Sequence, residues 1–216
     1  MPAFGLLLDD FDDNVRDPAL WSGSYGGVSE VGGRARVPCT TDFSGYASAP
    51  QWTLAGSSLA CRVHPPAAGG AAAEALAEVF VISAVGGTDA GFSVNAATGQ
   101  LVCLARGGYF DPAPVTLPYD PAAHAWLRLL ESGGVLYWDT SPDARTWTTR
   151  RSAAAPSWTA DGDLAVVLAG HRDSGTADFA EFDNFNIVRP GGLRSLQRGL
   201  AGPGPYPRST STVKGA

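Results

Sequence analysis

The clearest alternation of apolar and polar residues lies in the middle of the chain. Residues 125–131 and 135–140 are rich in Leu, Val, Trp and Tyr, and Ser132-Gly133-Gly134 stands between them. Glycine supplies the positive φ angles that a short turn between two antiparallel strands needs. The pattern therefore predicts a β-hairpin. A second turn at residues 141–144 and the segment 145–150 extend it to a three-stranded meander.

The loop length decides the register of this hairpin. If Gly133-Gly134 forms a two-residue type I′ loop, Arg128 lies opposite Asp139 and can form an ion pair. A three-residue loop instead places Arg128 opposite Trp138, where a cation–π contact would form. We favour the first alternative, because two successive glycines suit a type I′ turn.

Further short apolar segments follow one another along the chain, separated by turn residues. A composition of 44% hydrophobic and 17% charged residues fits many short strands and argues against a helix bundle or disorder. Trp21 is expected in the core, and residues 42–49 and 107–119 are expected to be connections. We predict the remaining strands over residues 4–8, 28–37, 51–63, 75–84, 92–96, 100–106, 163–170 and 180–188.

The hairpin region resembles a known family. It has Trp126 and Arg128 at alternate positions, then Glu-x-Gly-Gly from Glu131, an aromatic strand, and Thr-Ser-Pro-Asp followed by Trp147. This combination is similar to the concanavalin A-like (laminin G-like) jelly-roll domains of bacterial secreted proteins and bacteriophage minor tail proteins. The resemblance implies an all-β fold, a jelly-roll sandwich of two antiparallel sheets. One departure is Asp143-Ala144 in place of Asp-Gly, so we expect this turn to avoid the left-handed conformation.

The chain changes character near its end. Residues 1–190 are expected to form the β-sandwich, whereas residues 191–216 show no strand period and carry a basic balance in an otherwise acidic chain. Two interpretations remain open for this irregular tail. It is either a frayed end, or an arm that docks on a neighbouring subunit through Leu193, Leu196 and Leu200.

Charge and cysteine usage narrow the partners. The net charge of −6 argues against nucleic-acid binding, which needs a basic surface. The partners that remain are glycans, proteins and metal ions. Cys39, Cys61 and Cys103 are an odd number without metal-site spacing, and the last two are expected to be buried. The N-terminus resembles neither a signal peptide nor a membrane span. We therefore expect synthesis in a cytosol, no membrane insertion, and a virion as the carrier to a cell surface.

One strand resembles a catalytic motif of glucanases that share the expected fold. The segment from Glu181 to Asn186 is similar to their Glu-x-Asp-x-x-Glu strand, but its last position is an asparagine, which cannot donate a proton. His64, His124 and His171 suggest no catalytic arrangement. The expectation is therefore no catalytic residue and no enzyme activity.

The acidic run at residues 9–13 offers a possible calcium site together with the closing strand, because Ca²⁺ prefers several oxygen ligands. The expected ligands are Asp10, Asp12 and Asp183, and the alternative is a solvated acidic turn.

Sugar binding needs an aromatic face and planar polar groups. The candidates are Trp126, Arg128, Trp138, Tyr109 and Trp147. With the resemblance, they lead us to expect a non-catalytic phage (or phage-like) minor tail protein, oligomeric in an assembly. It would bind a host cell-surface glycan or decorate the tail, with the arm contacting other virion proteins. The alternatives are a glycan-processing hydrolase of the same fold and a purely structural subunit.

Overall fold

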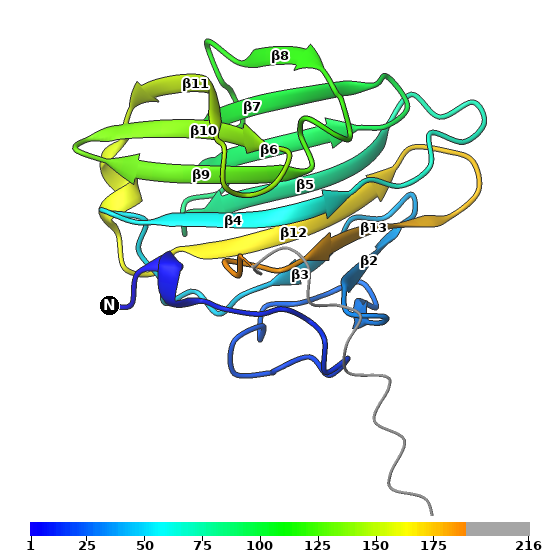
Figure 1. Cartoon of the computed structure of the whole chain (residues 1–216), viewed down its shortest axis with the longest axis horizontal. Helices are drawn as coiled ribbons and strands as arrows, with labels where there is room; N and C mark the ends of the chain where they lie inside the picture. Colours follow the sequence, from blue (N-terminus) through cyan, green and yellow to red (C-terminus); the bar gives the residue numbers. More distant parts are fainter. Residues whose placement is uncertain (189–216) are drawn as a thin grey trace, which may run out of the picture.

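The computed structural model describes residues 1–188, which form two antiparallel β-sheets packed face to face (Figure 1). The expected tail at residues 191–216 lies outside the described residues. Two short 3₁₀ turns, η1 (Phe4–Leu6) and η2 (Ser157–Ala160), accompany the strands. This architecture confirms the predicted jelly-roll sandwich. Within residues 1–188, no helix is long and apolar enough to cross a membrane.

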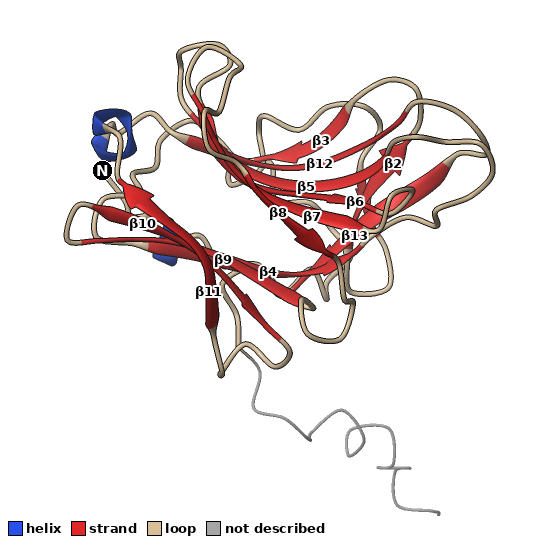
Figure 2. Ribbon diagram, turned by 90° about the horizontal axis from the view of Figure 1, so that it is seen from above, coloured by secondary structure: helices blue, strands red, loops and turns tan. Residues whose placement is uncertain are grey.

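Figure 2 shows the two sheets as separate layers. The seven-stranded sheet has the order β1-β2-β13-β4-β9-β10-β11, and the six-stranded sheet has the order β3-β12-β5-β6-β7-β8. The strands of the first sheet are β1 (Ser29–Glu30), β2 (Ala35–Cys39), β13 (Asp178–Asp183), β4 (Ser58–His64), β9 (Trp126–Ser132), β10 (Val135–Ser141) and β11 (Thr148–Ala154). Those of the second are β3 (Ser44–Ala47), β12 (Ala165–Arg172), β5 (Ala75–Ile82), β6 (Asp89–Asn95), β7 (Gln100–Arg106) and β8 (Val115–Pro118).

The core lies between the two sheets and is built from alternate residues of each strand. On β5, Val79 and Val81 are buried in this core, while Glu78 and Phe80 point to the opposite face of the sheet. Trp138 of β10 has no exposed surface, and its indole Nε1 donates hydrogen bonds to carbonyls of the six-stranded sheet. The core therefore leaves the outward row of β5 available for function.

The hairpin forms in the register that the two-residue loop predicts. Asp139 pairs with Arg128 across β9 and β10, and their side chains form an ion pair with Nη2 and Oδ2 2.6 Å apart. The alternative that pairs Arg128 with Trp138 is wrong. The guanidinium instead lies over the ring of Trp147, 4.3 Å from its centroid.

Two local predictions are wrong for reasons that the hydrogen bonds explain. Residues 4–8 form no strand, because the side-chain amide of Asn186 donates hydrogen bonds to the carbonyls of Phe4 and Leu7. In a β-ladder these carbonyls would accept from the N–H groups of a neighbouring strand. Ala144 adopts the left-handed conformation with φ 58° instead of avoiding it. Asp143 stabilises this turn, since its Oδ1 accepts hydrogen bonds from the backbone of Arg145 and Thr146.

Candidate functional site

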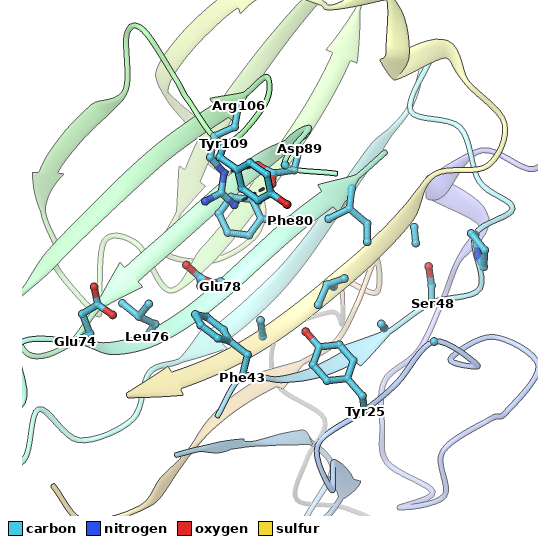
Figure 3. Close-up of a pocket in the computed structure, with 18 residues that line it drawn as sticks. Tyr25, Phe43, Ser48, Glu74, Leu76, Glu78, Phe80, Asp89, Arg106 and Tyr109 are labelled. Carbon is cyan, nitrogen blue, oxygen red and sulfur yellow. Dashed lines mark hydrogen bonds and ion pairs between the residues drawn. The ribbon is translucent and has the colours of Figure 1, made fainter. Parts of the chain in front are cut away.

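The outward face of the six-stranded sheet carries a cleft of about 750 Å³ (Figure 3). Its floor comes from the outward rows of two neighbouring central strands, β5 and β12. Opposite Phe80 and Glu78 on β5, β12 supplies Val167 and Ala169. Because these β12 side chains are small, the floor leaves room for a ligand above it. The strand predicted at residues 163–170 corresponds to β12, and one of its faces is this floor.

Two tyrosines form the walls at opposite sides of the cleft, and each lies on a glycine. A Cβ atom on Gly87 would come within 2.5 Å of the Tyr109 ring, and one on Gly45 within 2.6 Å of the Tyr25 ring. Tyr109 is held at φ 70°, and its backbone N–H donates to the carbonyl of Gly87. Its side chain is nevertheless 78% exposed. Close packing against glycine thus fixes the rings and leaves aromatic surface open to the cleft.

Glu78 is the carboxyl at the centre of the floor (Figure 3). Burial raises its pKa, and the nearby charges of Asp89 and Glu74 add to the rise. A hydrogen bond with Ser93 and the charge of Arg106 oppose it. A carboxyl that tends to keep its proton inside a cleft is chemically suited to act as an acid.

Asp89 and Arg106 form a second polar element, toward the Tyr109 wall. They face each other across β6 and β7, and the guanidinium donates two hydrogen bonds to the carboxylate, with lengths of 2.8 and 2.9 Å. The same guanidinium lies over the ring of Phe80, 4.7 Å from its centroid. Its charge is therefore neutralised and its position is fixed.

The other end of the cleft carries a carboxyl next to aromatic surface. His171 of β12 stacks on Phe43, with the ring centroids 4.0 Å apart and the planes 9° from parallel. Its Nε2 lies 3.5 Å from the carboxylate of Glu74, whose side chain is 53% exposed. This end therefore offers an open aromatic face and an accessible carboxylate. His171 was not expected to belong to a site.

The five predicted ligand residues do not form a single site. Tyr109 lies in the cleft, whereas Trp126, Arg128 and Trp147 line a smaller groove of about 210 Å³ associated with the seven-stranded sheet. Trp138 lies in the core without exposed surface and cannot contact a ligand here, because its indole completes the packing between the sheets. Glycan contact by the other four residues stays a prediction.

The strand that resembles the glucanase motif lies in the other sheet. Glu181 of β13 is held by two arginines, with Arg34 Nη1 at 2.5 Å and Arg36 Nε at 2.9 Å. Asn186 binds the backbone of the N-terminal turn. The residues on which the absence of catalysis was argued therefore belong to the scaffold of the seven-stranded sheet and do not line the cleft.

The expected calcium ligands do not gather in the described residues. Asp10 accepts a hydrogen bond from the backbone N–H of Asp12 within their own loop. Asp183 is buried, and its Oδ1 accepts from the Asn184 side chain. Residues 1–188 contain no group of three or more His, Cys, Asp or Glu that could hold a metal ion. The calcium site therefore stays a prediction, and a melting temperature that depends on calcium would test it.

Sequence reasoning missed most of the cleft. Glu78 left a signal, because it is a single acid inside the apolar run from Ala75 to Ile82 and shares a face with Phe80. Tyr25 and Phe43 gave no such signal. They come from segments outside the strands and reach the site only through the fold.

Comparisons with known proteins support the fold. No protein-family profile matches the sequence, and no curated protein matches it. Solved structures do match. The catalytic domain of an endo-1,3-beta-glucanase (laminarinase) from Thermotoga petrophila RKU-1 has a TM-score of 0.61 at 10% identity, covering 82% of this chain and 94% of that chain. A laminarinase from Flavobacterium sp. UMI-01 has a TM-score of 0.59 at 7% identity, covering 82% and 96%.

A phage module is also similar. The CBM2 module of the evolved Dit of Lactobacillus casei BL23 phage J-1 has a TM-score of 0.51 at 13% identity, covering 83% of this chain and 95% of that chain. The neighbours therefore share the concanavalin A-like fold and include both glycoside hydrolases and a phage carbohydrate-binding module.

The prediction that the chain is not an enzyme is contradicted by these comparisons, because the laminarinase neighbours are catalytic glycoside hydrolases. The physical reason for the error is the choice of strand. For a carboxyl pair, the argument considered only the segment from Glu181 to Asn186, whereas Glu78 and Asp89 of the cleft lie on the six-stranded sheet.

Proposed function

We propose that this protein is a glycan-processing hydrolase that binds an oligosaccharide in the cleft of the six-stranded sheet. Glu78 acts as the general acid. The observation that carries the proposal is the position of Glu78 at the centre of the floor, where burial raises the pKa of its carboxyl. General acids work best when their pKa lies near the working pH, so that they hold a proton to donate.

The surroundings of Glu78 suit a sugar. Pyranose rings bind through aromatic faces together with a few fixed polar groups. Tyr25, Tyr109 and Phe43 offer exposed aromatic surface around the cleft, and the Asp89–Arg106 pair offers fixed polar atoms. The likeness to two laminarinases supports the proposal at the level of the fold.

The spacing of the carboxyls argues against retention of the anomeric configuration. Glu74 precedes Glu78 by four residues, and Asp89 lies opposite Ile82, four residues beyond it. At about 3.3 Å per strand residue, each step is about 13 Å between Cα positions. A retaining pair needs carboxyls about 5 Å apart, and an inverting pair, which admits a water molecule, needs them about 6.5–9.5 Å apart. The Cα spacing around Glu78 is too wide for a retaining pair and also exceeds the inverting range, so we assign no general base.

Release of reducing ends from neutral polysaccharides, beginning with β-1,3-glucan, tests the proposal. Glu78→Gln should lower the rate by about 10²–10⁴-fold, which is the usual contribution of a general acid. Glu181→Gln is the matched control, because it makes the same chemical change on the other sheet and should leave the rate unchanged. NMR of the fresh product reports its anomeric configuration. Activity that survives in Glu78→Gln would contradict the assignment.

A second candidate function is a place in a bacteriophage tail. The chain would be a minor tail protein of the virion that binds a host cell-surface glycan through the cleft or decorates the tail. The likeness to the phage J-1 module supports it. Residues 191–216, with the arginines 194, 198 and 208 and Lys214, would contact acidic surfaces of other tail proteins.

Truncation after residue 190 tests this second candidate. The truncated chain should keep its free energy of unfolding within about 1 kcal/mol, which is the scale expected when no core contact is lost. It should fail to enter tail particles that incorporate the full chain. Normal incorporation would exclude the arm as an assembly element.

A further inference from the structure

The charges around the cleft are unbalanced. Three carboxyls line it, from Glu74, Glu78 and Asp89, against the single cation of Arg106 among the described lining residues. These carboxyls follow one another in steps of four strand positions along β5 and its neighbour β6. A ligand that lies along β5 therefore passes carboxyl groups at regular intervals.

Arg106 is already paired with a carboxylate, which weakens its attraction for an acidic ligand. Its Nε and Nη2 are both occupied by Asp89, and its guanidinium covers Phe80. A uronic acid or a sulfated sugar in the cleft would face the carboxylate of Glu74, and the one cation among the described lining residues is already paired with Asp89. Like charges placed together repel each other, so such ligands are disfavoured.

Glu74 can instead favour a ligand that carries a positive charge. Its carboxylate is half-exposed and close to Phe43, since both contact His171. Figure 3 shows Glu74 at one end of the cleft and the Phe43 ring projecting into it. A sugar ring that stacks on Phe43, whose side chain is 54% exposed, can bring a substituent to the carboxylate. An ammonium group would gain an ion pair there, while an N-acetyl group would not.

We propose that the glycan of this cleft carries free amino groups, and that Glu74 binds one of them beside the Phe43 ring. The proposal rests on the proposed function, because it names the substrate class of the same cleft. It assigns Glu74 to recognition of the ligand's charge, a role distinct from the proton donation by Glu78.

Titration calorimetry with two ligands of the same backbone tests it. The probes are a β-1,4-linked glucosamine hexamer and its fully N-acetylated counterpart. At about pH 6, where the free amines are largely protonated, the amine form should bind about fivefold more tightly, which corresponds to one partly exposed ion pair. High salt should reduce this preference toward equal affinity, because added ions screen the charges. A hexamer of galacturonic acid should not bind.

Glu74→Gln should abolish the preference for the amine form and keep binding of the acetylated form. Glu181→Gln, which changes a carboxylate outside the cleft, should keep the preference. Equal binding of the two hexamers by the unaltered protein would overturn the inference and leave the proposed function standing. A preference that persists in Glu74→Gln, or tight binding of the acidic hexamer, would also overturn it. If neither glycan nor any neutral oligosaccharide binds, the proposed function itself fails.

Discussion

Glu30 of β1 is a buried acid outside the cleft. Its Oε1 accepts a hydrogen bond from the Tyr46 hydroxyl, while Oε2 is buried and has no hydrogen-bond partner. Burial raises the pKa of Glu30 to about 7, and the nearby charges of Asp9 and Asp13 add to this rise. The folded protein therefore holds a proton that the unfolded chain releases.

This shift predicts that stability depends on pH below neutrality. The folded-state pKa of Glu30 lies above its ordinary value of 4.5. Its contribution is thus fully present below about pH 4.5 and is lost as the pH rises to about 7. At 1.36 kcal/mol per pH unit, the loss is about 3 kcal/mol. Glu30→Gln mimics the protonated form at every pH and should therefore not show this loss. At about pH 8 the variant should be more stable than the unaltered protein.

Thermal denaturation at about pH 5 and about pH 8 checks this prediction. The difference between Glu30→Gln and the unaltered protein should be larger at the higher pH. Glu181→Gln is the control, and it should show no such gain. Equal melting temperatures of the Glu30 variant and the unaltered protein at about pH 8 would show that Glu30 is ionised in the fold without a cost.

Ala144 provides a test of backbone strain. Its φ of 58° lies in the left-handed region, which costs an L-residue about 1–2 kcal/mol. Ala144→Gly removes this cost but adds freedom to the unfolded chain. We expect a net gain of about 0.5–1 kcal/mol in the free energy of unfolding, measured by urea denaturation. Ala55→Gly, at an exposed turn without positive φ, should lose stability instead.

At the scale of elements, one ion pair connects β11 with the connection between β7 and β8. Arg151 Nη1 lies 2.5 Å from Asp111 Oδ2, and both side chains are buried. Burial opposes ionisation, yet the hydrogen bonds from Arg151 and two backbone amides lower the pKa of Asp111 overall. Its contribution to stability is therefore kept at neutral pH and lost only as the pH falls through the lowered pKa.

Asp111→Ala should destabilise the protein by about 3–5 kcal/mol, because it leaves the Arg151 charge buried without its partner. The double variant with Arg151→Met should be more stable than Asp111→Ala alone, since neither charge then remains. Urea denaturation of the two single variants and the double variant measures this coupling. Strict additivity would mean that the two side chains do not interact.

The strands differ in how far the sequence predicts them. Alternation identifies β7, β9 and β10 well, because one face of each is apolar. The β-branched and aromatic residues of its apolar run identify β5. The strand β3 was missed, since its four residues are all buried and include serine and glycine, so no alternation arises. The strand β8 was missed because it is short and follows a proline-rich connection.

At the scale of the molecule, the site depends on the tertiary fold more than the strands do. Glu78 could be found from one strand alone. The approach of Tyr25, Phe43 and Tyr109 to one cleft could not, since it requires the order of the strands in the sheet and the packing of distant loops. Trp126 and Trp147 show this limit. They were predicted to bind sugar together with Tyr109, but they line a different groove, because the identity of an aromatic residue does not tell on which sheet its side chain lies.

The two sheets therefore predict separable effects on glycan affinity. Phe43→Ala should weaken binding about tenfold, because it removes an aromatic stacking face from the cleft. Trp126→Ala, in the groove associated with the other sheet, should leave affinity for the cleft ligand unchanged. Calorimetry with one neutral oligosaccharide compares them. Loss of binding in the Trp126 variant would place the glycan in that groove.

The packing of Tyr25 and Tyr109 against glycines constrains which residues can replace those glycines. Gly45 lies in β3 at an ordinary φ, so an alanine there would meet no backbone strain, only the Tyr25 ring. Under selection for folding alone, we expect this position to accept small side chains once Tyr25 has moved aside. Under selection for ligand binding it should accept glycine only. The two selections would thus yield different mutational tolerance at a residue that has no side chain with which to touch the ligand.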